Sequence, residues 1–238
     1  MSVTRSHRVG SSRRPFIHIV VCLAWIIVGP LSAQHLAAAE NRLVAEFWAE
    51  REPTIRTEVE YPLRRDEALR RILDEARWTF SGMIYGYRFH YRPFDRARGV
   101  AEQFDLELHA ELPWGDPALS VLNVRHADKR YYVQLQYRMA EHQAAWVHGW
   151  QSRAIPRAAG SGEAPLRPGV EQKRSAVEDA IRLALREHLR GVTRNKPHSA
   201  RGRLILTAPP RVWIDSGAYK ASVQIKVIVD ELRRYEFF

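Results

Sequence analysis

The chain has 238 residues, of which 45% are apolar and 27% charged, and its formal net charge is +10. This ordinary globular composition excludes a disordered or collagen-like chain. A single cysteine excludes a disulfide scaffold and a cysteine-based zinc module, because each of these needs at least two thiols.

Residues 1–39 have the layout of a secretory signal peptide. Residues 1–14 carry four arginines and no acid, an apolar run covers 16–28, and small residues follow. This run is shorter than the roughly 20 residues that a spanning helix needs. The A-x-A pattern ending at Ala39 predicts cleavage there, with cleavage after Ala33 and a retained N-terminal membrane anchor as alternatives.

Export constrains the chemistry of the mature protein. Cleavage removes Cys22, so no thiol remains for catalysis, redox chemistry or metal binding. The adjacent Arg13 and Arg14 leave two routes open, the general secretory route and the twin-arginine route. We therefore expect a periplasmic or secreted protein that touches the membrane only transiently, through its signal peptide, and that does not meet nucleic acid.

Residues 40–150 are predicted to form a first module of one helix and several strands. Residues 54–61 alternate between apolar and polar, which is typical of a half-buried strand. From Asp66 to Ile84 the apolar residues follow the period of a helix. Strands are predicted at 87–91, 104–112, 119–124 and 131–139, with a hairpin turn at 126–129 and a short helix at 141–150.

Residues 170–238 are predicted to form a second module of the same kind. The stretch 151–169 before it contains several prolines and glycines, which interrupt both periods and predict an exposed loop or linker. The second module has a helix over 171–190 and a long strand over 219–229. Two short strands, 203–207 and 211–214, lie between them.

This pattern predicts an α+β fold with two modules, in each of which a helix lies on an antiparallel sheet. The helix segment 67–73 parallels 179–185, and Val133-Gln134-Leu135 parallels Val223-Gln224-Ile225. These parallels fit a duplication of one module. They also fit two unrelated modules, because any helix followed by hairpins has a similar pattern.

The helix pattern Ala176-x-x-x-Ala180-Ile181-Arg182-x-Ala184-Leu185, followed by the strand 219–229, resembles a known kind of module. It is similar to the small helix-plus-strand modules of bacterial periplasmic flagellar-assembly and surface-lipoprotein proteins. The likeness covers 176–229 and departs from the lipoproteins in lacking a lipobox cysteine at the mature start. It implies a non-catalytic assembly or envelope role and transfers no functional residue.

The candidate ligand-binding residues lie in 85–98, where aromatic and basic residues alternate. Such side chains can stack on rings and pair with phosphates or carboxylates. In an exported protein this chemistry favours an anionic glycan, a lipid headgroup or an envelope protein as the partner. The alternative is that the aromatic side chains face the core and the basic ones face water. The candidates are Tyr87, Arg88, His90, Tyr91, Arg92 and Arg96.

Motifs of catalysis are absent from the sequence: it has no G-x-S-x-G, P-loop or H-E-x-x-H motif, and we expect no cofactor and no metal. We expect a non-catalytic binding or assembly module. The alternative is an envelope hydrolase or glycan-processing enzyme that uses carboxylates of the 104–112 strand. Its candidate residues are Asp105, Glu107, His109 and Glu111, which an amphipathic strand would equally present to water.

N-terminal sequencing of the protein purified from cells tests the export prediction. We expect the sequence to begin at Glu40, because signal peptidase cuts after the A-x-A pattern. Recovery of the intact precursor from the cytosolic fraction would contradict export. Recovery of a membrane-bound chain that retains residues 16–28 would indicate an anchor instead.

Overall fold

The computed structural model describes residues 41–235 without 53–61, 168–170 and 194. In this part of the chain, three α-helices pack on nine strands in antiparallel sheets, which confirms the predicted α+β class. The predicted signal peptide and the predicted strand at 54–61 lie outside the described residues. None of the described helices combines the length and the apolar character needed to cross a bilayer.

The first sheet has three strands in the order β1-β5-β4. Its strands are β1 (Arg42–Glu50), β4 (Leu119–Ala127) and β5 (Arg130–Arg138). Asp128 and Lys129, both with positive φ, form the two-residue turn between β4 and β5, as a right-twisted hairpin requires. Helix α2 (Arg65–Ile84) covers the face that carries Phe47, whose ring meets that of Phe80 at 5.6 Å.

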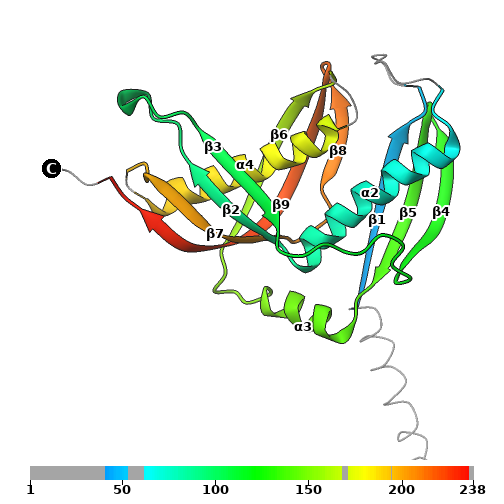
Figure 1. Ribbon diagram of the computed structural model, residues 1–238, viewed down its shortest axis with the longest axis horizontal. Helices are drawn as coiled ribbons and strands as arrows, with labels where there is room; N and C mark the ends of the chain where they lie inside the picture. The colour runs from blue at the N-terminus through cyan, green and yellow to red at the C-terminus, as the bar shows by residue number, and fades with distance from the viewer. Residues whose placement is uncertain (1–40, 53–61, 168–170, 194, 236–238) are drawn as a thin grey trace, which may run out of the picture. The chain divides into compact units, whose positions relative to one another are not determined.

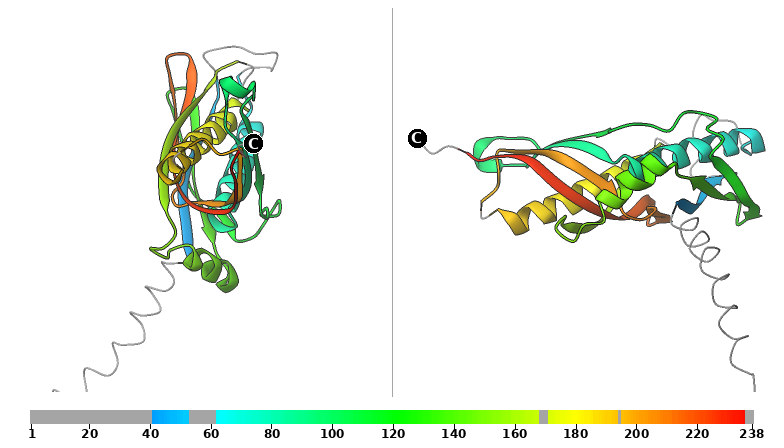
Figure 2. Two further views of the ribbon diagram at one scale, coloured as in Figure 1. Left: turned by 90° about the vertical axis from the view of Figure 1, so that its left-hand side faces the viewer. Right: turned by 90° about the horizontal axis from the view of Figure 1, so that it is seen from below.

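The second sheet has six strands in the order β3-β2-β7-β9-β6, and β8 pairs with β9. Figures 1 and 2 show α4 (Gln172–Val192) lying along β6 and β9 on one face of this sheet. A short helix, α3 (Glu141–Gly149), precedes β6, and a 3-10 turn, η1 (Arg96–Arg98), follows β2. The strands are β2 (Tyr87–Arg92), β3 (Gln103–Leu108), β6 (Arg157–Pro165), β7 (Ser199–Leu206), β8 (Arg211–Asp215) and β9 (Ala218–Arg233).

Part of the strand pairing is common to the two modules. In the first, β1 pairs with β5, the second strand of the β4–β5 hairpin, and α2 packs on this group. In the second, β6 pairs with β9, the second strand of the β8–β9 hairpin, and α4 packs on it. The strands that follow the two helices, β2 and β7, pair with each other. The shared part fits a duplication, but β7 also pairs with β9 whereas β2 pairs with β3, so the pairing of the two modules is not identical.

Two predicted segments differ from the structure. The strand predicted at 104–112 ends at Leu108, because its partner β2 begins only at Tyr87, directly after Gly86 turns the chain with a φ of 76°. The stretch 151–169, predicted as a loop or linker, contains the regular strand β6. Its glycines serve packing rather than chain flexibility.

Helix α4 approaches β6 so closely that the facing strand positions have no room for side chains. A Cβ added at Gly160 would lie 2.4 Å from the carbonyl oxygen of Ala180, and one at Gly162 would lie 2.2 Å from the backbone nitrogen of Ala180. Neither distance is compatible with van der Waals contact. Glycine is therefore required at both positions. In the sequence alone these glycines indicate a loop, so this packing was not predicted.

Replacing Gly162 with alanine should lower the free energy of unfolding by about 2 kcal/mol or more, because α4 must move away from β6. Urea unfolding measures the change. Gly191→Ala is the matched control, since Gly191 lies within α4 and its added Cβ would meet nothing within 4 Å. Alanine at position 191 should raise the free energy of unfolding by up to about 1 kcal/mol, because alanine has a higher helix propensity than glycine. Equal stability of the two variants would contradict the close packing.

Candidate functional site

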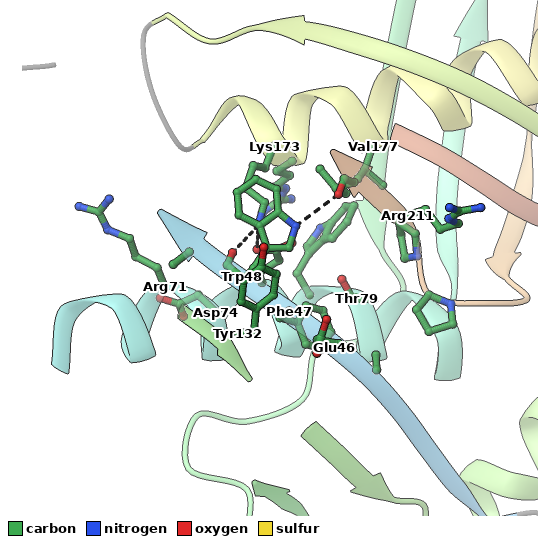
Figure 3. A pocket seen from close by; sticks show the side chains of 18 of the residues that line it. Glu46, Phe47, Trp48, Arg71, Asp74, Thr79, Tyr132, Lys173, Val177 and Arg211 are labelled. Carbon is green, nitrogen blue, oxygen red and sulfur yellow. Dashed lines mark hydrogen bonds and ion pairs between the residues drawn. The ribbon is translucent and has the colours of Figure 1, made fainter. Parts of the chain in front are cut away.

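A cleft with a volume of about 1040 Å³ lies where the two modules meet. Strands β1 and β5 and helix α2 line it from the first module, and helix α4 and strand β8 line it from the second. Aromatic rings form much of its wall, and charged side chains lie among them (Figure 3). The aromatic residues are Phe47, Trp48, Trp78, Tyr132 and Trp213.

Lys173 is the centre of the polar contacts in the cleft. It lies in the first turn of α4 and is 3% exposed. Its Nζ donates to the backbone oxygen of Trp48 at 2.7 Å and pairs with a carboxylate oxygen of Glu75 at 2.5 Å. The same nitrogen lies 4.1 Å from the centre of the Trp48 ring, as Figure 3 illustrates. One lysine of the second module thus binds both a strand and the helix of the first.

Guanidinium groups pack on the indole rings of the cleft. Arg130 lies 4.3 Å from the ring centre of Trp48, and Arg174 lies 4.8 Å from that of Trp78. The indole nitrogen of Trp48 donates to the backbone oxygen of Val212 at 3.3 Å, which joins β1 to β8. These contacts hold the rings in fixed orientations. The cleft is therefore a preformed surface rather than a loose gap.

Most carboxylates of the cleft form ion pairs, whereas two of its cations form no ion pair with a described residue. Glu46 pairs with Arg125 at 2.8 Å, Asp74 pairs with Arg77 at 3.3 Å, and Glu75 pairs with Lys173. Among the described residues, three charged lining groups have no ion-pair partner. These are the cations Arg130 and Arg211 and the carboxylate Glu171, at the start of α4.

This arrangement suits a ligand that offers both apolar surface and negative charge. The rings supply flat apolar contact, and the unpaired guanidiniums supply donors for carboxylate or phosphate oxygens. No three histidine, cysteine or carboxylate side chains of the described part come together as a metal site would need.

The predicted ligand-binding segment is divided between the two faces of its sheet. Tyr87 and Tyr91 are 1% exposed and lie in the core, whereas Arg88 and His90 lie on the opposite face. Burial raises the pKa of Tyr87, and burial together with a 2.7 Å hydrogen bond to Glu102 raises that of Tyr91. The six candidates therefore do not form one surface.

The remaining candidates lie toward the end of β2 and beyond it. Arg92 is half-buried, and its Nε has no hydrogen-bond partner in the described structure. Arg96 is exposed in the 3-10 turn η1. Arg88, His90 and Arg96 remain candidates for an exposed basic surface, separate from the cleft.

The predicted acidic group is spread along an exposed surface. Asp105 contacts His90 at 3.5 Å, and Glu111 pairs with Arg77 at 3.2 Å, with about half of each carboxylate side chain exposed. The ring of His109 stacks on Trp146 at 5.8 Å. His109 and Glu111 lie beyond the end of β3, and none of these residues lines the cleft.

Sequence reasoning did not identify the residues of the cleft. Trp48, Lys173 and Val212 are far apart in the chain, and only the packing of the two modules brings them together. One signal existed in the sequence. Lys173 is placed one helical turn before Val177, on the apolar stripe of α4, where a charge is costly unless it finds a partner.

The comparisons with known proteins show the family. The model of one protein family matches residues 31–235, and the chain belongs to this family of uncharacterised proteins. An uncharacterised protein of Treponema pallidum (strain Nichols) is 26% identical over 161 residues, which cover 68% of each chain. No solved structure matches the chain.

Replacing Glu75 with leucine should lower the free energy of unfolding by about 3 kcal/mol, because Lys173 is left buried without its carboxylate. Adding Lys173→Met should recover most of this loss, since the buried charge is then gone as well. Urea unfolding of the two single variants and the double variant measures the coupling. Additive losses would show that the pair does not act as a unit.

Proposed function

We propose that this protein is exported to the cell envelope and acts there as a non-catalytic binding or assembly module, with the cleft as its binding site. The single observation that carries this proposal is the cleft built around Lys173, where both modules contribute to one preformed surface. The partner is an envelope protein, an anionic glycan or a lipid headgroup.

Support for export comes from the sequence. Residues 1–39 combine a basic head, a short apolar run and an A-x-A cleavage pattern. The resemblance of 176–229 to periplasmic flagellar-assembly and surface-lipoprotein modules points to the same compartment and to an assembly role.

Support for binding comes from the way in which the cleft is held open. The indole of Trp48 is fixed by its bond to Val212 and by the cations on its ring, so a ligand would not have to order this side chain. Preorganisation of this kind lowers the entropic cost of association. Trp213 is 39% exposed at the cleft and offers a ring for contact.

The hydrolase alternative finds less support in the geometry. General acid–base catalysis needs two groups that converge on one bond of the substrate. Asp105 instead contacts His90, Glu111 pairs with Arg77, and His109 stacks on Trp146. The binding proposal therefore accounts better for this surface.

The test compares two pairs of substitutions in the processed protein. Trp213→Ala/Arg211→Ala removes an exposed ring and an unpaired cation from the cleft, and Arg88→Ala/Arg92→Ala removes cations from β2. Each protein is immobilised and exposed to fractionated envelope extract. We expect the cleft variant to retain at least about tenfold less of the material that the wild type binds, because stacking and ionic contacts are lost.

The β2 variant should retain as much material as the wild type. Equal retention by the cleft variant, with loss in the β2 variant, would move the binding site to the surface predicted from the sequence. Turnover of any envelope component by the wild type would contradict a purely binding role.

A further inference from the structure

Two strand edges face the cleft without a partner strand among the described residues. Within this part of the chain, β1 ends the first sheet and pairs only with β5, and β8 pairs only with β9. No backbone hydrogen bond joins β1 to β8 within the described residues. A free edge presents unpaired N–H and C=O groups, which can accept another strand.

The lining of the cleft shows that these edges, rather than the faces of the strands, form it. Five consecutive residues of β1, 45–49, line the cleft, and so do the consecutive residues 209–213 at β8. Side chains of consecutive strand residues point to opposite faces, so a surface that contacts all of them runs along the edge. The cleft accordingly has α2 on one side of β1 and Tyr132 on the other.

The two edges run in the same direction. Trp48 on β1 contacts Val212 on β8. Two residues further along β1, Glu50 accepts a 2.7 Å hydrogen bond from Tyr219, which pairs with Ile214, two residues further along β8. A single inserted strand can therefore run antiparallel to both neighbours at once, which is the more stable kind of pairing.

The gap between the edges is wider than a direct strand pair allows. An indole side chain, rather than backbone, bridges β1 and β8, through the bond from Trp48 to Val212. Neighbouring strands lie about 4.8 Å apart, so paired edges would have no room for a ring between them.

We propose that an extended, acidic polypeptide segment of a partner protein adds as a strand between β1 and β8, and so joins the two sheets. This inference rests on the proposed role of the cleft as the binding site and names the class of its ligand. It is β-strand addition, in which backbone hydrogen bonds give affinity and side chains give selectivity.

The backbone groups needed for pairing point into the cleft. Lys173 binds the carbonyl oxygen of Trp48 from the cleft, so that residue directs its backbone groups toward the cleft. Because the pattern alternates along a strand, Glu46 does the same. On β8, the carbonyl oxygen of Val212 is the corresponding group. Both carbonyl oxygens already accept a side-chain hydrogen bond, from Lys173 and from the Trp48 indole, so an added strand pairs with them only by displacing these two donors.

The charges of the cleft favour an acidic segment. Arg130 and Arg211 have no carboxylate partner in the described structure, whereas Glu46, Asp74 and Glu75 are already paired and Glu171 alone is an unpaired carboxylate of the lining, so the unpaired cations outnumber the unpaired acids there. Arg211 and Trp213 project from the same face of β8, so a carboxylate and an apolar side chain on one face of the segment would find partners there.

The test uses fluorescein-labelled synthetic octapeptides and the purified protein. The first alternates glutamate with valine, the second replaces glutamate with lysine, and the third repeats the first with N-methyl groups on alternate backbone nitrogens. We expect the lysine peptide and the N-methylated peptide to bind at least about tenfold more weakly than the glutamate peptide. The lysine peptide lacks charge complementarity to the cleft, and the N-methylated peptide cannot donate the backbone hydrogen bonds of a strand pair.

Arg211→Glu should weaken binding of the glutamate peptide at least about tenfold and strengthen binding of the lysine peptide. Arg88→Glu is the matched control, since Arg88 is an exposed strand arginine outside the cleft. This substitution should leave the affinities for the glutamate peptide and the lysine peptide unchanged. Hydrogen exchange at the amides of Glu46 and Trp48 should slow when the glutamate peptide binds.

Equal binding of the N-methylated peptide would overturn strand addition. β4 also has an outer edge that no described strand pairs with, and it exposes Val121, Leu122 and Val124. Protection of β4 would place the peptide on that edge and overturn the assignment to the cleft. A third outcome is that none of the peptides binds, while the Trp213→Ala/Arg211→Ala variant still retains less envelope material than the wild type. This result would overturn the peptide as the class of ligand and leave the proposed binding role of the cleft in place.

Discussion

The direct contact between α4 and β6 determines where the other parts of the second module lie. Because Gly160 and Gly162 carry no side chain, the helix backbone rests on the strand, and small residues such as Ala180 face it. This contact fixes the direction of α4 and brings its first turn to the edge of β1. Lys173 can then reach both Trp48 and Glu75, and α4 becomes one wall of the cleft.

The cleft follows from incomplete pairing between two sheets. The modules share a continuous ladder at β2 and β7, whereas at β1 and β8 the described residues meet through the indole of Trp48, which binds the backbone oxygen of Val212. Buried ionic contacts there cost desolvation, and the Lys173–Glu75 pair offsets this cost by satisfying both charges. A junction made in this way stays open along two strand edges, whereas an apolar junction of the same size would close by packing.

Strong periodicity made part of the fold predictable. The helices α2 and α4 and the long strand β9 have apolar faces that local pattern alone reveals, and the structure places them as expected. β6 was not predicted because its glycines are required by the close packing of α4 on the strand. This is a tertiary constraint that the local sequence does not show. β1 was missed although Leu43, Ala45, Phe47 and Ala49 alternate, since the neighbouring Val44 and Trp48 weaken the contrast between its faces.

The functional residues were harder to predict, for a different physical reason. Alternation correctly separates Tyr87 and Tyr91 from Arg88 and His90, because side chains of a strand point to opposite faces, but it cannot show which face has a partner. Trp48, Lys173 and Arg211 carry no common motif. Their proximity depends on how the two modules dock, which no local window contains.

The pairing of β2 with β7 bears on the symmetry of the molecule. Each strand follows the helix of its own module, and the two run antiparallel, with Phe89 opposite Gly202. This is the contact that two identical chains make across a twofold axis, where the same patch meets itself. The other neighbours of these two strands differ, since β2 also pairs with β3 and β7 with β9, so the two halves are not equivalent around this contact. This lack of equivalence lets one half supply a tryptophan and the other a lysine to a cleft without symmetry.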